Sequence, residues 1–181
     1  MTEPRPKNRF TVNLALISIF VALWVAFNLT VAPLSFYLTG LPVIHSVIIF
    51  FTLLLVVWAT GQFGAASLVG IIGSAIALLA GGQPPIIGFI PGAIIFDLVF
   101  LVNGHRVSLR RFNIGVAVIA SIICGYVSAV FNGFFILFLP RFFILTVWGG
   151  LVVAGAVIGV ALALPVVRIL EKAQVKRVQA D

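Results

Sequence analysis

The hydrophobic residues of this chain form long continuous runs, separated by short stretches in which glycine, proline and charged residues gather. Each run is close to the roughly 20 apolar residues that a transmembrane helix needs. The alternation of apolar and polar positions that marks the strands of a membrane β-barrel is absent from these runs. The pattern predicts six membrane-spanning helices, at about residues 10–31, 45–61, 64–81, 86–103, 112–139 and 143–170.

Composition supports the same fold class. Of the 181 residues, 62% are hydrophobic and 8% are charged, whereas an average soluble domain has roughly 25% charged residues. The charged start MTEPRPKNRF is typical of a signal peptide, but the apolar run behind it is long enough to span a membrane and no small-residue cleavage site follows it. We therefore expect an all-α integral membrane protein, with residues 1–181 forming a single membrane domain of six helices joined by short loops.

The basic residues predict an orientation, because Lys and Arg are enriched in cytoplasmic loops. With six spans, the groups before the first helix, between the fourth and fifth, and after the sixth share one face. Arg141 is the one residue of the 11 Lys and Arg that falls on the other face. We expect a multi-pass protein of the cell membrane with cytoplasmic N- and C-termini. The three groups are Arg5, Lys7 and Arg9; Arg106, Arg110 and Arg111; and Arg168, Lys172, Lys176 and Arg177.

The longest connection on the predicted outer side, residues 32–44, is apolar and aromatic and contains APLSFYLTGLP. An exposed loop of that composition would be poorly solvated. It is therefore expected to be an outer capping loop that folds over the mouth of the bundle. The alternative is that Phe36 and Tyr37 act as an interfacial anchor, as in aromatic belts.

Small residues spaced four apart allow helices to approach closely in a membrane. We expect such contacts in three helices: at Ala15, Ala22 and Ala26 in the first, at Gly70 and Ser74 in the third, and at Gly155 and Gly159 in the sixth.

Asp97 is the only acidic residue within the predicted spans. A charged residue there costs about 2.5 to 3.5 kcal/mol on insertion scales, so it usually faces a bundle interior or a substrate path. Two interpretations remain open: the floor of a binding site, or a polar anchor between helices that bonds to Tyr126 or Ser128. Asp97 lies nearer the predicted cytoplasmic end of its helix, so direct substrate contact is expected at the outer end, residues 83–89.

Polar and aromatic side chains also gather in the predicted outer halves of the helices. A small-molecule site usually combines an apolar, aromatic lining with a few convergent polar groups. The alternatives are interhelical hydrogen bonds for the asparagines, and headgroup or aromatic-belt positions for the His, Arg and Trp. The candidate substrate-binding residues are Asn28, Tyr37, His45, Gln83, Phe89, Asp97, Asn132, Arg141 and Trp148.

Several function classes lack their sequence motifs. There is no GxxxxGK[ST] loop for ATP hydrolysis, no HExxH helix and no Ser/His/Asp constellation. His45 and His105 are predicted on opposite faces, and the single cysteine, Cys124, is expected to be a small buried residue. We therefore expect a protein that is not an enzyme, has no catalytic residues, and needs no metal or cofactor. Because the basic residues flank the spans, a nucleic-acid partner is not expected.

This pattern resembles the substrate-binding S components of energy-coupling factor (ECF) vitamin transporters over nearly the whole chain. The resemblance is carried by the basic start, the alanine pair in ALWVA at residues 22–26, the capping segment and the six short-looped spans. It implies that Ala22 and Ala26, together with Ala15, dock on a membrane-embedded T subunit. It also implies two ATPase subunits as partners, which drive the uptake of a small vitamin or vitamin precursor by this type of ABC importer.

A narrower resemblance is to the hydroxymethylpyrimidine and thiamine branch. FGAASL at residues 63–68, GGQP at residues 81–84 and FDLVF at residues 96–100 are similar to that branch, which has an acidic residue where Asp97 stands. This implies thiamine or its pyrimidine precursor as the substrate. The chain departs from the branch by lacking further acidic residues in the third helix and before the second. It also lacks the His-rich start of the nickel and cobalt members.

Two other function classes remain open. A stand-alone, proton-coupled small-molecule permease would use Asp97 as its titrating group; such carriers often contain internal repeats, and no convincing repeat is visible. A non-transporting membrane assembly protein would gain no stability from any ligand, since only a ligand that binds the folded state stabilises it.

Overall fold

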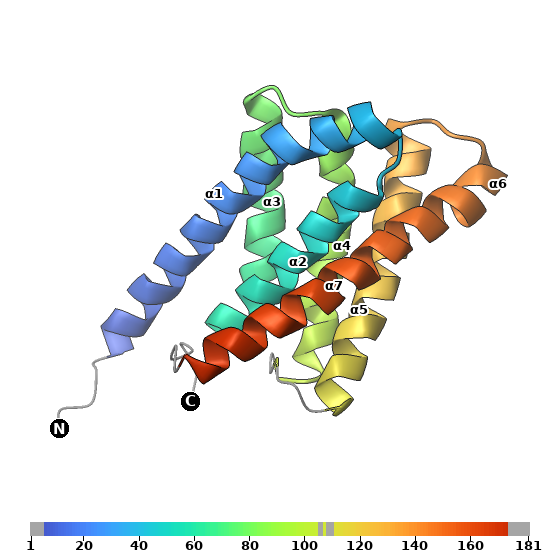
Figure 1. Cartoon of the computed structure of the whole chain (residues 1–181). Helices are drawn as coiled ribbons and strands as arrows, with labels where there is room; N and C mark the ends of the chain where they lie inside the picture. The colour runs from blue at the N-terminus through green and yellow to red at the C-terminus, as the bar shows by residue number, and fades with distance from the viewer. Residues whose placement is uncertain (1–5, 105–106, 108–110, 174–181) are drawn as a thin grey trace.

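The computed structural model describes residues 6–104, 107 and 111–173, and these form a bundle of helices (Figure 1). His105 and the basic residues Arg5, Arg106, Arg110, Lys176 and Arg177 lie outside the described residues. The elements are α1 (Pro6–Thr39), α2 (Val43–Thr60), α3 (Ala65–Leu79), η1 (Pro84–Gly88), α4 (Phe89–Leu101), α5 (Arg111–Phe131), η2 (Asn132–Ile136), α6 (Arg141–Phe143), η3 (Ile144–Trp148) and α7 (Gly149–Lys172).

The predicted all-α membrane fold is confirmed. Within the described residues, five helical segments are long and apolar enough to cross a membrane: Phe10–Thr39, Val43–Thr60, Pro84–Leu101, Asn113–Ile136 and Arg141–Lys172.

The remaining helix, α3, has 15 residues and is shorter than the predicted 64–81. Gly64 and Gly81, with φ of 89° and 92°, flank it in left-handed backbone that is open to glycine but costly for other residues. These two glycines bound the helix, one on each side, and make it shorter than its hydrophobic pattern suggests.

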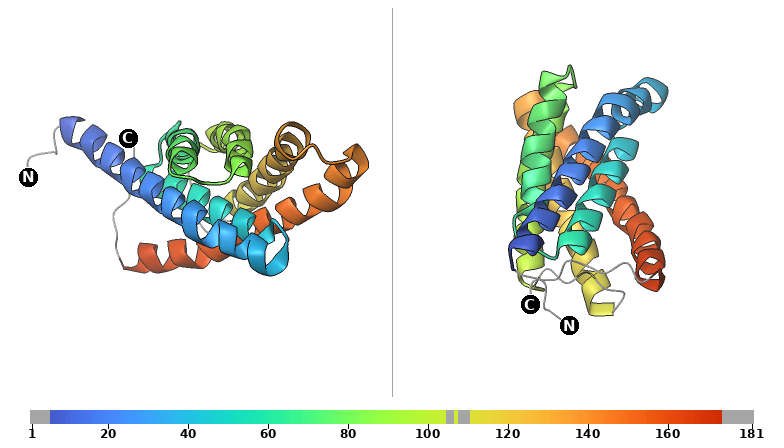
Figure 2. Two further views of the ribbon diagram at one scale, coloured as in Figure 1. Left: turned by 90° about the horizontal axis from the view of Figure 1, so that it is seen from above. Right: turned by 90° about the vertical axis from the view of Figure 1, so that its left-hand side faces the viewer.

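The helices pack in the order α1, α3, α4, α5, α7 and α2, and α2 then returns to α1. Seen from above, α3, α4 and α5 form one row, while α1 and α7 run along the other side with α2 between (Figure 2). Helix α2 is the most enclosed of the spans, with 72% of its apolar window buried. α1 begins and α7 ends at the same end of the bundle, here called the terminal end; the opposite end, where α1 meets α2, is the capped end (Figure 1).

Glycines allow close approach at most of these interfaces. A Cβ on Gly73 of α3 would meet the Trp24 ring of α1, and one on Gly70 of α3 would meet Ala93 of α4. On α7, Gly155 and Gly159 lie directly against the backbone of α2. The predicted close contacts of the third and sixth helices are therefore confirmed.

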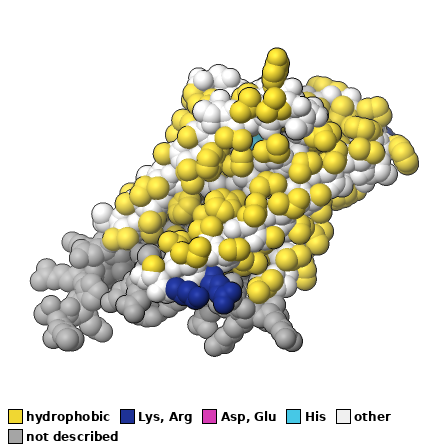
Figure 3. Space-filling view, in the orientation of Figure 1, with side chains coloured by type: hydrophobic (Ala, Val, Ile, Leu, Met, Phe, Trp, Pro, Cys, Tyr) yellow, Lys and Arg dark blue, Asp and Glu magenta, His cyan; other side chains and the backbone are white. Residues whose placement is uncertain are grey.

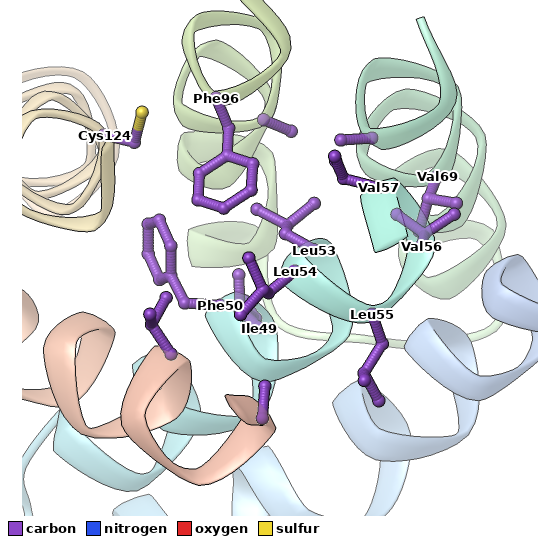
Figure 4. Close-up of a cluster of buried hydrophobic side chains, with 14 of the residues drawn as sticks. Ile49, Phe50, Leu53, Leu54, Leu55, Val56, Val57, Val69, Phe96 and Cys124 are labelled. Carbon is purple, nitrogen blue, oxygen red and sulfur yellow. The ribbon is translucent and has the colours of Figure 1, made fainter. Parts of the chain in front are cut away.

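The core fills the space around α2. Phe50, Leu53 and Leu54 of α2 are fully buried, and the Phe50 ring meets Phe96 of α4 edge-on with centroids 6.0 Å apart (Figure 4). Cys124 of α5 is also fully buried, as predicted. The face seen in Figure 3 is mostly hydrophobic, with Lys and Arg side chains near the terminal end. Such a surface is suited to lipid contact.

The capping segment differs from its predicted conformation. Helix α1 continues to Thr39, so most of residues 32–44 is helical and only the residues around Gly40 and Leu41 form a connection. Pro33 lies inside the helix, and proline both removes a backbone hydrogen bond and kinks a helix. Beyond Pro33 the last turns of α1 lead across to the start of α2 (Figure 1). The apolar sequence is therefore accommodated by helix instead of by a folded loop.

Candidate functional site

A group of polar and aromatic side chains, all buried except the half-buried Phe36, lies at the capped end and is here called the His45 cluster. It consists of Asn28 and Phe36 from α1, His45 from α2, Phe89 from α4 and Asn132 from η2. Asn28, His45, Phe89 and Asn132 are exposed by only 4%, 5%, 2% and 3%. Four of the predicted substrate-binding residues therefore lie in one buried region, although they come from distant parts of the sequence.

The Asn28–His45 hydrogen bond determines which nitrogen of the imidazole ring carries the proton. Asn28 Nδ2 donates to the Trp24 carbonyl oxygen at 2.8 Å, which leaves Asn28 Oδ1 to face His45 Nε2 at 2.6 Å. A carbonyl oxygen only accepts hydrogen bonds, so Nε2 must carry a proton and donate it. In the neutral ring, Nδ1 then keeps its lone pair and acts as an acceptor.

Two aromatic rings flank the imidazole. The Phe89 ring lies edge-on to His45 with centroids 5.0 Å apart, and the Phe36 ring lies edge-on at 6.2 Å. Both separations fall within the range of favourable aromatic pairs. The same last turns of α1 leave Tyr37 87% exposed. Phe36 therefore covers the cluster, whereas Tyr37 faces outwards, as in the anchor alternative.

Asn132 opens the π-helical turn η2, which interrupts the regular end of α5. Its side-chain amide lies directly against Gly88, where any Cβ would collide with it. Asn132 Oδ1 is buried and has no hydrogen-bond partner among the described residues. A buried unpaired acceptor costs about 1 to 3 kcal/mol, and π turns occur frequently at functional sites. Asn132 is thus the cluster residue with the clearest unused bonding capacity.

Trp148 ends a second π-helical turn, η3, and its buried Nε1 donor likewise has no partner among the described residues. The two turns contact each other, with Gly133 packed against Ile144. Between them, Phe138 has a φ of 49°, a backbone conformation rare for bulky residues. Irregular backbone is therefore concentrated where α5 passes into α6 and α7.

Three further predicted site residues are not brought into the cluster. Tyr37 and Arg141 are exposed, and Gln83 is exposed immediately before η1. The exposed positions of Tyr37 and Arg141 fit an interfacial anchor and a headgroup position, respectively. The exposed Gln83 is likewise not placed for contact with a ligand buried in the cluster.

Asp97 is an anchor between helices, and its partner is Ser67. Asp97 Oδ2 accepts hydrogen bonds from the Ser67 backbone N–H and from Ser67 Oγ, both at 2.6 Å. Ser67 is in the first turn of α3, where backbone N–H groups have no partner within the helix and the dipole favours negative charge. Asp97 is fully buried and lies about 12 Å along α4 from Phe89, at 1.5 Å per residue.

The prediction that Asp97 bonds to Tyr126 or Ser128 was wrong. The Tyr126 hydroxyl donates to the Leu145 carbonyl oxygen at 3.3 Å, and Ser128 packs against Gly92. The identity of the true partner was hidden because Ser67 precedes Asp97 by 30 residues and only the antiparallel packing of α3 on α4 brings them together.

The predicted docking alanines lie on the exposed side of α1. Ala15, Ala22 and Ala26 are all exposed, and Ser18 lies exposed between them. Only 22% of the apolar window of α1 is buried within the bundle, the smallest share among the spans. This face is exposed in the described bundle, and its small side chains allow a neighbouring helix to approach closely.

Comparison of the chain with protein-family models, with curated proteins and with solved structures found no match.

Proposed function

We propose that this protein is a substrate-binding membrane subunit that captures a small molecule at the His45 cluster. The observation that carries the proposal is the burial of Asn28, His45 and Asn132 together at one end of the bundle, with Asn132 Oδ1 unpaired. Convergent polar groups in an aromatic, apolar surround are the usual composition of a small-molecule site. Inside a membrane bundle an ionisable residue such as His45 is a functional candidate by default, whereas asparagines there also serve as hydrogen-bonding groups between helices.

The proposal includes an orientation. Among described side chains, Arg168 and Lys172 belong to the end of α7, and Arg141 belongs to α6 at the capped end. Together with the basic groups elsewhere in the sequence, this favours a cytoplasmic terminal end and a capped end that faces outwards in the cell membrane. The His45 cluster would then receive substrate from outside.

The second part of the proposal is that energy comes from partners, as in ECF-type importers. The chain has no nucleotide-binding loop. The exposed small-residue face of α1, with Ala22 and Ala26 at its centre, supports docking on a membrane-embedded subunit. That subunit would in turn carry the two ATPases. The resemblance to the hydroxymethylpyrimidine and thiamine branch adds thiamine or its pyrimidine precursor as candidate substrates.

The binding part is tested by purifying the protein without added ligand and identifying bound small molecules by native mass spectrometry. We expect a reproducible small molecule, which the Asn132→Leu variant should lose. The matched control is Thr146→Val, at an exposed position whose hydroxyl bonds only to the Phe142 carbonyl oxygen one turn earlier. A wild-type protein that carries no ligand, and gains no thermal stability from extracts of small molecules, would contradict the proposal.

The docking part is tested with Ala22→Leu/Ala26→Leu. This double variant should lose co-purification with the partner subunits while keeping its ligand. Ala154→Leu/Ala161→Leu provides a matched control, because these alanines are exposed on α7 instead of α1. If the two double variants co-purify equally well, the docking assignment is wrong. The proposal of a ligand site at the His45 cluster is not affected by that result.

A stand-alone permease driven through Asp97 is less well supported, because Asp97 already accepts two hydrogen bonds from Ser67. Uptake into proteoliposomes driven by a pH gradient, in the absence of any ATPase, would favour the permease over the proposed binding subunit.

A further inference from the structure

We propose that the connection between α5 and α6 inserts into the membrane interface at the capped end, where Arg141 binds the phosphate group of an anionic phospholipid. The connection and its flanks, residues 131–143, are here called the phenylalanine elbow. This inference concerns lipid contact and does not depend on any ligand at the His45 cluster. It follows from four properties of the elbow: its composition, its backbone hydrogen bonds, its position in the bundle and its charge.

Phenylalanine is concentrated in this short segment. The elbow holds six of the 17 phenylalanines of the chain: Phe131, Phe134, Phe135, Phe138, Phe142 and Phe143. Phe138 and Phe142 are 82% and 80% exposed, and Phe135 is 67% exposed. In water these three rings would keep their apolar surface in contact with solvent, which is unfavourable. Their exposure is accommodated if the elbow lies among lipid.

The backbone of the elbow pairs its donors within the chain. The Leu137 N–H donates to the Asn132 carbonyl oxygen at 2.8 Å. The Leu139 N–H donates to the Gly133 carbonyl oxygen at 2.9 Å. Pro140, the next residue, has no N–H to satisfy. Because unpaired backbone groups are strongly unfavourable where lipid replaces water, this connection is suited to a place where water is scarce.

The elbow lies at the side of the bundle. Helix α7 runs obliquely to α3 and α4, so α6 at its start lies away from them and beyond α5 (Figure 1). Seen from above, α6 is again at the edge of the bundle (Figure 2). In Figure 1 it also stands no higher than the capped ends of α3 and α5. A segment in this position meets the lipid beside the bundle instead of the water above it.

Arg141 is the single charged residue of the elbow, and its side chain is exposed. Among the described acidic side chains, Asp97 is buried against Ser67 and Glu171 is in the last turn of α7 at the terminal end. Neither is placed to neutralise Arg141. A guanidinium group binds phosphate through two parallel hydrogen bonds. An anionic phospholipid is therefore the fitting partner, since a zwitterionic headgroup carries its own cation beside the phosphate.

The first experiment measures whether lipid covers the elbow. A small thiol-reactive fluorophore is attached to the Phe142→Cys variant of the full chain in lipid nanodiscs, and its quenching by aqueous acrylamide is measured. The matched control is Gln83→Cys, because Gln83 is also exposed but lies in the polar connection before η1. Cys124 is fully buried and should remain unlabelled. Quenching should be at least fivefold weaker at Phe142→Cys, and equal quenching at the two positions would overturn the insertion.

The second experiment measures which lipid lies against Arg141. The fluorophore at Phe142→Cys is exposed to lipids that carry a nitroxide on the acyl chain close to the headgroup and quench at short range. At equal nitroxide content, phosphatidylglycerol should quench at least twofold more than phosphatidylcholine, and Arg141→Gln should abolish this difference. Arg168 and Lys172 belong to the end of α7 at the terminal end, so they do not contribute to a short-range signal at the elbow.

Thermal unfolding separates a loss of lipid contact from a loss of structure. Arg141 and Phe142 are exposed, so Arg141→Gln and Phe142→Cys should unfold at the same temperature as the wild type. Phe135→Cys repeats both measurements at a second exposed ring. A phosphatidylglycerol preference that survives Arg141→Gln, or that is absent before this substitution, would overturn the phosphate assignment. Strong acrylamide quenching without lipid quenching would place the elbow in water and overturn the whole proposal.

Discussion

The Asp97–Ser67 contact predicts a specific energetic coupling between α3 and α4. Asp97 Oδ2 accepts from both the N–H and the Oγ of Ser67 at 2.6 Å, and Asp97 is fully buried. Hydrogen bonds to charged groups contribute about 1.5 to 3 kcal/mol, and neutral ones about 1 kcal/mol. Ser67→Ala removes one of the two bonds, and we expect the free energy of unfolding to fall by about 1.5 to 3 kcal/mol.

Asp97→Asn keeps an acceptor oxygen but makes both bonds neutral. It should lower the free energy of unfolding by about 1 to 3 kcal/mol. In the double variant the hydroxyl bond is already absent, so the two losses should not add. The expected coupling energy is about 1 kcal/mol, well above the roughly 0.3 to 0.5 kcal/mol within which independent sites are additive.

The assay is equilibrium unfolding in mixed detergent micelles, applied to the wild type, both single variants and the double variant. Ser18→Ala is the matched control, because the Ser18 hydroxyl donates to the Leu14 carbonyl oxygen within α1 and is exposed. It should change stability by less than about 0.5 kcal/mol and show no coupling to Asp97→Asn. Strict additivity of Asp97→Asn and Ser67→Ala would refute the anchor role.

Three other predictions follow from packing and burial. Gly159→Ala forces α7 away from the α2 backbone and should cost about 1 to 3 kcal/mol in unfolding measurements, whereas Gly150→Ala, which meets no atom within 4 Å, should be neutral or stabilising; equal effects would contradict the close contact. His45→Leu leaves Asn28 Oδ1 buried without its partner and should destabilise by about 1 to 3 kcal/mol; adding Asn28→Leu should recover part of that loss, and a further additive loss would argue against the hydrogen bond. Maleimide should label Cys124 only after denaturation, as judged by mass shift, because its side chain is fully buried; rapid labelling of folded protein would show that α5 packs differently.

The sequence was sufficient to predict the class of fold because membrane helices reveal themselves through long apolar runs. It also predicted Gly155 and Gly159 as contact positions, since small residues four positions apart lie on one face of a helix and allow another helix to approach. The end of α1 was placed too early: the change in sequence at Pro33 suggested a loop, whereas the apolar residues beyond it are better accommodated by a helix. Local composition alone does not separate a proline kink from a helix end.

The candidate site was only partly predictable. Asn28, His45, Phe89 and Asn132 were recognised as polar or aromatic residues near one end, but their meeting depends on how the helices are ordered around α2. Ser67 was missed as the partner of Asp97 because a serine near a helix start usually bonds locally. The π turns were also missed, since no residue pattern in the sequence distinguishes them from regular helix.

The unequal lengths of the helices affect the lipid around the protein. At 1.5 Å per residue, α1 is about 51 Å long and α3 about 22 Å, whereas the hydrocarbon layer is about 30 Å thick. Excess length can be absorbed by tilt, and α1 and α7 do run obliquely to α3 and α4 (Figure 1). A helix that is too short cannot use tilt, and thinning of the bilayer beside it is one way in which the mismatch is accommodated. The ring of lipid around the protein would then be asymmetric, thin along α3 and close to normal thickness beside α1. The protein would favour membrane regions of low thickness.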